Sequence, residues 1–533
     1  MMTSCATPKE KADLILVGGK IYTVDSVFSV AEAVAVSEGR ISATGSNDDI
    51  LARFEAEKVV DLNGLPVYPG FNDGHCHFYG YGENQVRYAD LRGSQSFDEV
   101  VERLQKHHQT FPSDWILGRG WDQNQWEIKE FPDNDPLEVV FPGKKILLIR
   151  IDGHAVLASK SLIKEAGING NTIVQGGEVI IGGDGEPTGV LIDKAEDAVK
   201  RLIPPLTAEE QRKALLLAQE DCFSQGLSSV TDAGLGAQTI ALIEDMHQLG
   251  SLNIRINAML NPDQESLDTF SARGPLRSEK LSVHSVKLYA DGALGSRGAK
   301  LLEPYSDDPL QSGLILHPKE YYDSICQWAV NHGFSVSTHA IGDSANRFLL
   351  ELYKQFLTEG NDLRWRIEHA QVVHPDDVKC FGSLGIIPSI QSTHATSDMY
   401  WAEERLGAER IKNAYAQKTL LKQHGWLING TDFPIEHISP IYTFYAAISR
   451  KDLNGYPEDG FLSAQAFSRE EALRSITLWP AKGSFEENLK GSIEAGKLAD
   501  LVVLDRDIMT VDEKEIPEAR VRQLYLSGKQ MLD

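Results

Sequence analysis

Two patterns of apolar and polar positions occur along the chain. Near both ends, short runs of alternating apolar residues are interrupted by Gly-Gly, Glu-Gly and Asn-Gly pairs, a pattern typical of β-hairpins. These runs are ADLILVGGKIYTVD, AEAVAVSEGRISATG and KVVDLNGLPVYPG at the N-terminal end, and GSIEAGKLADLVVLDRD and ARVRQLYLSGKQM at the C-terminal end. We therefore predict one small composite β-sandwich that is assembled from residues 1–66 and 480–533.

The middle of the chain has a different pattern. From Val67 onward, short β-branched runs alternate with amphipathic helical stretches, which is typical of parallel strands joined by crossover helices. Eight runs are found, the number that closes a barrel. They cover residues 67–77, 227–234, 253–260, 284–292, 334–343, 364–371, 386–394 and 426–434. The predicted fold class is therefore α/β, with a (β/α)8 TIM barrel formed by residues 67–83 and 206–479.

The interval between the first two predicted strands is too long for a single crossover helix. Residues 84–205 are therefore predicted to form an insertion after barrel strand 1, and they include GRGWDQNQWE, KKILLIRIDGHAV and QGGEVIIGGDGEPTGVL. Because the insertion leaves the barrel at the carboxyl ends of the strands, we expect it to form one wall of the substrate pocket.

Composition and charge narrow the classes of partner. Lysine and arginine number 52 against 77 aspartates and glutamates, which gives a net charge of −25. Such a surface repels phosphate backbones and anionic lipid, so we expect no nucleic acid partner. No apolar run reaches the ~20 residues that a transmembrane segment requires. The partner that we expect is a small-molecule substrate.

The five cysteines are widely scattered and form no CxxC pair, which is typical of free thiols in a reducing compartment. We therefore expect a cytoplasmic protein. Cys5 leaves an alternative open, because a cysteine followed by a short polar stretch resembles the start of a mature bacterial lipoprotein. If the true start lies upstream of Met1, the protein would be exported and anchored at Cys5.

Potential metal ligands stand at the ends of most of the predicted strands. In a parallel barrel these ends meet at one face. The residues concerned are His75, His77, Lys287, His339, His369 and Asp432. Residues two apart on a strand point to the same side, so His75 and His77 can reach one ion while Cys76 points away. Taken together, these positions predict a metal site.

Each of these residues also has an ordinary structural explanation. His75 and His77 could be a chance pair on a loop, and His339 and His369 could be hydrogen-bonded core histidines, although imidazole suits zinc and similar ions. Asp432 could cap a helix; beside a metal-activated water it could instead take up the water's proton.

Lys287 lies in an apolar strand, where an unpaired ammonium group is costly. Burial lowers the pKa of a lysine, and the neutral amine could then add carbon dioxide to give a carbamate that bridges two metals. The alternative is a salt bridge to Asp291 or to another acidic residue.

These motifs resemble the amidohydrolase superfamily, specifically the amidohydrolase-3 branch that includes the N-substituted formamide deformylases. The resemblance extends over essentially the whole chain through GGKIYTVD, PGFNDGHCH, VKLYADGALGSRGA, STHAIGD, RIEHAQ, NGTDFP and GSIEAGKLADLVVLD. It implies a barrel with a composite β-sandwich, and a hydrolase that acts on C–N bonds of amide-like substrates.

The resemblance also implies roles for individual residues. His75, His77, His339 and His369 would be metal ligands, Asp432 the catalytic aspartate, and Lys287 the carbamylated lysine that bridges two metals in many members. Other members use one metal and no such lysine, so the expected cofactor is one or two divalent ions, with zinc foremost. A homodimer is expected from the habit of the family.

The predicted function is hydrolysis of an N-acyl or N-formyl compound by a metal-activated water with Asp432 as the base. Two alternatives remain open at this point: a cyclic amide, carbamate or ester hydrolase with the same metal centre, and a non-catalytic regulatory or binding protein. The predicted substrate contacts, each of which could instead serve packing or capping, are Trp121, Asp122, His154, Tyr289, Asp291, Arg297 and His394.

Overall fold

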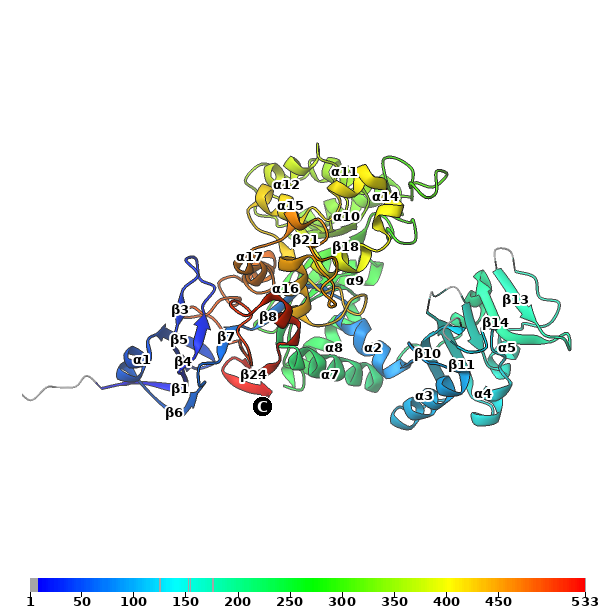
Figure 1. Ribbon diagram of the computed structural model, residues 1–533, viewed down its shortest axis with the longest axis horizontal. Coiled ribbons are helices and arrows are strands. Elements are labelled where there is room, and N and C mark those ends of the chain that lie inside the picture. The colour runs from blue at the N-terminus through cyan, green and yellow to red at the C-terminus, as the bar shows by residue number, and fades with distance from the viewer. Residues whose placement is uncertain (1–7, 124–125, 152, 154, 175–176, 533) are drawn as a thin grey trace, which may run out of the picture. The chain divides into compact units, whose positions relative to one another are not determined.

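The computed structural model describes residues 8–123, 126–151, 153, 155–174 and 177–532 (Figure 1). The chain divides into two compact units: residues 1–78 with 218–533, and residues 79–217. The first unit contains the barrel and the sheets formed by the chain ends, and the second contains the predicted insertion. Among the described residues, no helix is both long enough and apolar enough to cross a membrane.

Eight parallel strands form the barrel of the first unit, which confirms the predicted fold class. Their spatial order follows the sequence: β8 (Phe71–Cys76), β15 (Leu227–Leu235), β16 (Arg255–Leu260), β18 (Leu281–Tyr289), β19 (Ser335–Ala340), β20 (Arg366–His369), β21 (Ile387–Ile390) and β22 (Ile428–Asn429). A short strand, β17 (Leu276–Arg277), pairs with β18 in antiparallel fashion. Each predicted barrel strand overlaps one of these eight.

Helices connect the barrel strands. They are α7 (Ala208–Ser224), α8 (Ala237–Gln248), α9 (Gln264–Arg273), α10 (Lys319–His332), α11 (Asp343–Tyr353), α12 (Val378–Leu384), α15 (Gln417–His424) and α16 (Pro440–Ser449). Two further helices, α13 (Ser392–Asp398) and α14 (Ala402–Arg410), follow β21, and α17 (Arg469–Ser475) and α18 (Leu478–Gly483) follow α16. Helix α11 gives an example of how a helix contacts the barrel strands. Its buried Tyr353 hydroxyl lies 2.6 Å from the Thr338 hydroxyl on β19.

The two chain ends form two sheets. One contains β1 (Glu10–Val17), β4 (Ala33–Ser37), β5 (Arg40–Gly45) and β6 (Phe54–Asp61), with the short helix α1 (Asn47–Arg53) between the last two. The other joins β2 (Lys20–Tyr22), β3 (Val30–Ala31) and β7 (Pro66–Pro69) to the C-terminal strands β23 (Leu501–Leu504), β24 (Val521–Leu526) and β25 (Lys529–Leu532). Leu14, Val36 and Leu501 share one buried apolar cluster, so residues from both chain ends pack together.

The first predicted barrel strand, residues 67–77, is in fact two strands. β7 belongs to the sheet of the chain ends and β8 belongs to the barrel, and Gly70 separates them. A Cβ atom on Gly70 would lie 2.3 Å from the Ser228 hydroxyl oxygen, so a larger residue would displace Ser228. Apolar periodicity alone does not reveal this break, because both strands are buried throughout.

The second unit is built on a six-stranded mixed sheet. Its order is β13 (Gly177–Ile181), β14 (Pro187–Asp193), β12 (Ala155–Ala158), β11 (Lys145–Arg150), β10 (Trp115–Trp121) and β9 (Tyr88–Asp90). Its helices include α3 (Phe97–Thr110), α4 (Asp135–Val140), α5 (Lys160–Glu165) and α6 (Asp197–Lys200). Leu148 and Leu147, adjacent on β11, lie in two different apolar clusters, as alternation along a strand requires. Helix α2 (Phe78–Arg87) and α7 lead into and out of this unit.

One buried ion pair gives a testable prediction. Arg255 on β16 binds Asp500, just before β23, through two contacts of 2.6 and 2.8 Å. We expect Asp500→Ala to lower the free energy of unfolding by about 3–5 kcal/mol, because it leaves a buried guanidinium group without its partner. Urea denaturation followed by circular dichroism measures this loss.

The exposed pair of Arg53 and Glu10, 2.8 Å apart, supplies the control. Glu10→Ala should change the free energy of unfolding by at most ~1 kcal/mol. Equal effects of the two substitutions would contradict the role assigned to Asp500.

Candidate metal centre

Histidines from several barrel strands gather at the carboxyl end of the barrel. The ring centroids lie 5.9 Å apart for His75 and His77, 5.0 Å for His75 and His369, 4.5 Å for His339 and His369, and 5.8 Å for His369 and His394. Asp432 and Lys287 lie within 3.6 Å of His75 Nε2. The structure therefore brings together all six residues that the sequence predicted as metal site, and His394 with them.

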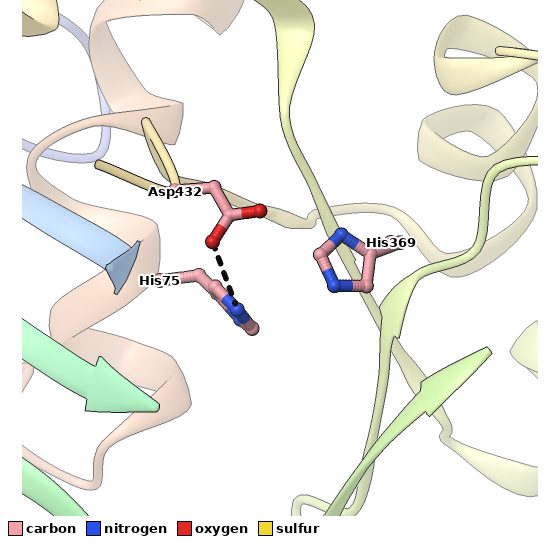
Figure 2. Close-up of side chains that lie close together, drawn as sticks. All are labelled: His75, His369 and Asp432. Atoms are coloured by element: carbon pink, nitrogen blue, oxygen red, sulfur yellow. Dashed lines mark ion pairs between the residues drawn. The ribbon is translucent and has the colours of Figure 1, made fainter. Parts of the chain in front are cut away.

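Three of these residues form a compact donor group. One ligand atom each from His75, His369 and Asp432 lies within 4.8 Å of the others, and all three residues are buried. Figure 2 shows the Asp432 carboxylate next to His75, with His369 facing them across the site. Two imidazoles and a carboxylate are a donor set that suits zinc.

The spacing of the donors also fits a metal ion. Asp432 Oδ1 lies 3.4 Å from His77 Nε2 and 3.6 Å from His75 Nε2. Donor atoms around a tetrahedral zinc with bonds of ~2.1 Å lie ~3.4 Å apart. Asp432 Oδ1 and His394 Nε2 are buried without a directed hydrogen-bond partner among the described residues. The residues present therefore fit a divalent ion.

Unusual backbone conformations place two of the donors. On β20, Glu368 points towards His75 Nδ1, so strand alternation would turn His369 to the opposite side. His369 instead has φ +73° and Ala370 has φ +40°, so the strand ends in a left-handed turn next to the site. Asp432 has φ +61°. Non-glycine residues in this region cost of order 1–3 kcal/mol and cluster at functional sites.

The two histidines of the donor group are oriented by hydrogen bonds at Nδ1. His75 Nδ1 lies 2.6 Å from Glu368 Oε2, and His369 Nδ1 lies 2.7 Å from Gln391 Oε1. Both partners are acceptors, so each Nδ1–H donates and each Nε2 keeps its lone pair for a metal. The sequence patterns do not single out Glu368; its place in a buried strand beside a predicted ligand is the signal that could have found it.

Lys287 has no carboxylate partner among the described residues. Its side chain is buried, and Nζ lies 3.5 Å from His75 Nε2 and 4.8 Å from the centre of the Tyr289 ring. Within the described part of the chain, no carboxylate oxygen lies within 4.0 Å of Nζ. Burial lowers the pKa of Lys287, although Glu368, Asp432 and Asp232 oppose this shift. A salt bridge to Asp291, the alternative for this lysine, is not formed.

The protonation states suit metal binding. Burial lowers the pKa of His339 to about 3, and it holds the pKa of His369 well below its usual value, so both rings are neutral near pH 7. Burial alone would raise the pKa of Asp432, but the hydrogen bond with His77 and the imidazoles of His75, His369 and His394 outweigh burial and lower this pKa, so the carboxylate stays ionised. Neutral imidazole and ionised carboxylate are the forms that bind metals.

The predicted substrate contacts of the first unit differ in their surroundings. His394 Nε2 lies 3.5 Å from Asp432 Oδ2, and the partly exposed Tyr289 hydroxyl donates to Ala233 O at 3.4 Å. Asp291 accepts the backbone N–H groups of Lys300, Ile341 and Gly342, and so ties two loops together. Arg297 binds Asp307 at 2.8 Å. His394 thus contacts the donor group. Asp291 Oδ1, 3.6 Å from His339 Nε2, and the Tyr289 ring, 5.7 Å from the His339 ring, lie next to the predicted ligand His339.

The remaining predicted contacts belong to the second unit. Trp121 is buried in an apolar cluster and its indole N–H donates to Leu148 O at 3.0 Å, as its packing alternative describes. Asp122 Oδ1 accepts from Arg150 Nη2 at 2.7 Å. His154 lies outside the described residues. That the insertion forms a pocket wall stays a prediction.

Comparison with known proteins supports the family seen in the motifs. The chain belongs to the Amidohydrolase family, whose family model matches residues 58–532. It is similar to YtcJ of Bacillus subtilis (strain 168), with 30% identity over 96% of this chain and 98% of that protein. N-substituted formamide deformylase of Arthrobacter pascens is 26% identical, with 97% of each chain covered.

Among solved structures, an uncharacterized metal-dependent hydrolase from Pyrococcus horikoshii OT3 matches with a TM-score of 0.80 and 29% identity, covering 94% of this chain and 99% of that one. The predicted membership of the amidohydrolase-3 branch is thereby confirmed. The chain is a hydrolase of the amidohydrolase superfamily with a buried His–His–Asp group.

The donor group predicts a loss of metal when either histidine is removed. We expect His75→Ala and His369→Ala each to weaken zinc binding by more than the ~10–100-fold that loss of an outer contact costs. Elemental analysis of protein purified without chelator or nickel column measures the bound metal. His374→Ala, which alters a partly exposed histidine hydrogen-bonded to the Asp376 N–H, is the control. Full metal content in both variants would refute the ligand assignment.

Proposed function

We propose that this member of the Amidohydrolase family hydrolyses an amide-like C–N bond in a small N-acyl or N-formyl compound. The observation that carries the proposal is the buried His75–His369–Asp432 group at the carboxyl end of the barrel. Similarity to the N-substituted formamide deformylase along nearly the whole chain supports the choice of C–N bond. The barrel positions this group where enzymes of this fold carry their active sites.

Several residues would hold the metal in this proposal. His75, His77, His339, His369 and Asp432 would hold one or two divalent ions, and Lys287 would join them if its amine is carbamylated. A divalent ion, zinc foremost, would activate water and polarise the scissile carbonyl group. Lys287 can serve as a bridge only after its neutral amine adds carbon dioxide and loses a proton, which yields a carbamate.

Asp432 would perform the proton transfer. Its ionised carboxylate is an acceptor only, so it can take a proton from the attacking water and return it to the leaving amine. His394, 3.5 Å from Oδ2, would orient this carboxylate and contact the substrate. The half-exposed Tyr289 would form part of the substrate-binding surface beside Lys287.

The proposal predicts that a substitution of Asp432 lowers the rate of hydrolysis but leaves the metal bound. We expect Asp432→Asn to lower kcat by ~10²–10⁴-fold, the usual contribution of a positioned acid–base group, and to retain metal. Hydrolysis of N-formyl, N-acyl and cyclic amide libraries by metal-loaded protein measures the rate. Asp376→Asn, at an exposed carboxylate, is the matched control. An unaltered rate in Asp432→Asn would exclude it as the base.

The state of Lys287 is a second prediction. We expect a carbamate on Lys287 in crystals of protein grown with excess zinc and bicarbonate, with two ions per chain by elemental analysis. Lys287→Ala should then bind a single ion. Electron density for an unmodified amine in protein that holds two ions would refute the bridge.

A further inference from the structure

Behind the metal donors lies a buried glutamate that is not itself a ligand. Glu368 has no solvent exposure, and its Oε2 lies 2.6 Å from His75 Nδ1. We propose that Glu368 is the positioning residue of this centre: it fixes the ring of His75 and makes it the stronger of the two buried imidazole donors. This inference rests on the proposed function, because it requires that His75 binds a metal.

The contact determines which nitrogen of His75 faces the site. An ionised carboxylate only accepts hydrogen bonds, so the proton of the imidazole resides on Nδ1. A distance of 2.6 Å is short even for a charge-assisted hydrogen bond. Nε2 is left without a proton, and it points towards Asp432 Oδ1 and Lys287 Nζ at 3.6 and 3.5 Å. The ring is therefore presented to the site in its metal-binding tautomer.

Glu368 faces Arg366 in the barrel interior. Arg366 lies two residues earlier on β20, so its side chain points to the same side of the strand. Its Nη1 lies 4.0 Å from Glu368 Oε1 and 3.5 Å from Gly74 O, and its Nη2 lies 3.2 Å from the Ser484 hydroxyl. Among the described residues Glu368 Oε1 has no hydrogen-bond partner, so Arg366 contributes a nearby positive charge and His75 the directed hydrogen bond.

Stability does not explain why this charge is present. Replacing a buried ion pair by well-packed apolar residues is often neutral or stabilising, so such a pair is weak evidence of a structural role. A carboxylate behind a metal-binding imidazole, in contrast, raises the basicity of the ligand and fixes its orientation. A role behind a metal ligand therefore accounts for the buried charge of Glu368, which a role in stability does not require.

His369, the other histidine of the donor group, provides an internal comparison. His369 Nδ1 donates to the neutral amide oxygen of Gln391 at 2.7 Å, in the same manner as His75 donates to Glu368. The two imidazoles thus have equivalent hydrogen bonds and differ in the charge of the acceptor. Glu368→Gln would make the two alike, because it keeps the acceptor oxygen and the size of the side chain.

The test compares wild type with Glu368→Gln as metal-free and as metal-loaded full-length protein. We expect the zinc Kd to rise ~10–100-fold, the usual cost of losing an outer contact of a metal ligand. We also expect the visible absorption spectrum of the cobalt(II)-loaded protein to change, since His75 becomes a weaker donor. The Tm of the metal-free variant should stay close to that of wild type. Glu487→Gln, at a carboxylate paired with Arg364 at 2.8 Å, should leave all three measurements unchanged.

The outcomes separate the proposals. If wild type binds zinc and Glu368→Gln binds it equally tightly with the same cobalt spectrum, this inference is wrong and the proposed function stands. A lowered Tm of the metal-free variant with unaltered zinc affinity would assign Glu368 a structural role and overturn the inference. Failure of wild type to bind any metal would overturn both. Should Glu368→Gln fail to fold, Glu368→Asp, which keeps the charge but shortens the side chain, should show the same rise in Kd.

Discussion

The junction between the first and last barrel strands is the contact on which the rest of the site depends. Asp432 N–H donates to His75 O and His77 N–H donates to Phe433 O, both at 2.8 Å, so the end of β8 and the segment that follows β22 are joined directly at the candidate metal donors. The buried Asp73 carboxylate reinforces the junction, because it accepts the Thr431 hydroxyl at 2.6 Å and the His75 N–H at 3.1 Å. Closing the barrel and assembling the donors are thus one event.

Two glycines allow this close approach. A Cβ atom on Gly74 would lie 2.1 Å from the side chain of Ile428, and one on Gly430 would lie 2.5 Å from the His75 nitrogen. The motifs PGFNDGHCH and NGTDFP therefore carry residues of two kinds: those that provide donor atoms and those that let the two backbones come together. Burial also sets the charges of the site, because it lowers the pKa values of His339 and His369 and keeps both rings neutral. The imidazoles around Asp432 lower its pKa and keep the carboxylate ionised.

The periodic parts of the fold could be predicted from the sequence, and the local exceptions could not. All eight barrel strands and the strands of both chain ends leave an apolar pattern, and the Glu-Gly turn is a hairpin with φ +53° and +74°. The break at Gly70 leaves no such pattern, because the strands on either side are equally buried. Glu368 was not indicated, because its role depends on His75, which is distant in the sequence. For Trp121 the sequence left packing and substrate contact open, because an aromatic residue on an insertion can serve either; the structure shows it in a buried apolar cluster.

The segment of β7 and β8 belongs to two sheets in succession, and this affects when the donor group can form during synthesis of the chain. β7 pairs with β23 near residue 502, and β8, which begins after Gly70, pairs with β15 and ends beside Asp432. The segment that carries His75 is made early during translation, yet β23, its partner in the sheet of the chain ends, lies near the C-terminal end, and Asp432 follows the last barrel strand. The donor group therefore cannot be complete until the last barrel strand has been synthesised. A nascent chain that stops before β22 holds His75 and His369 without the carboxylate that completes the group.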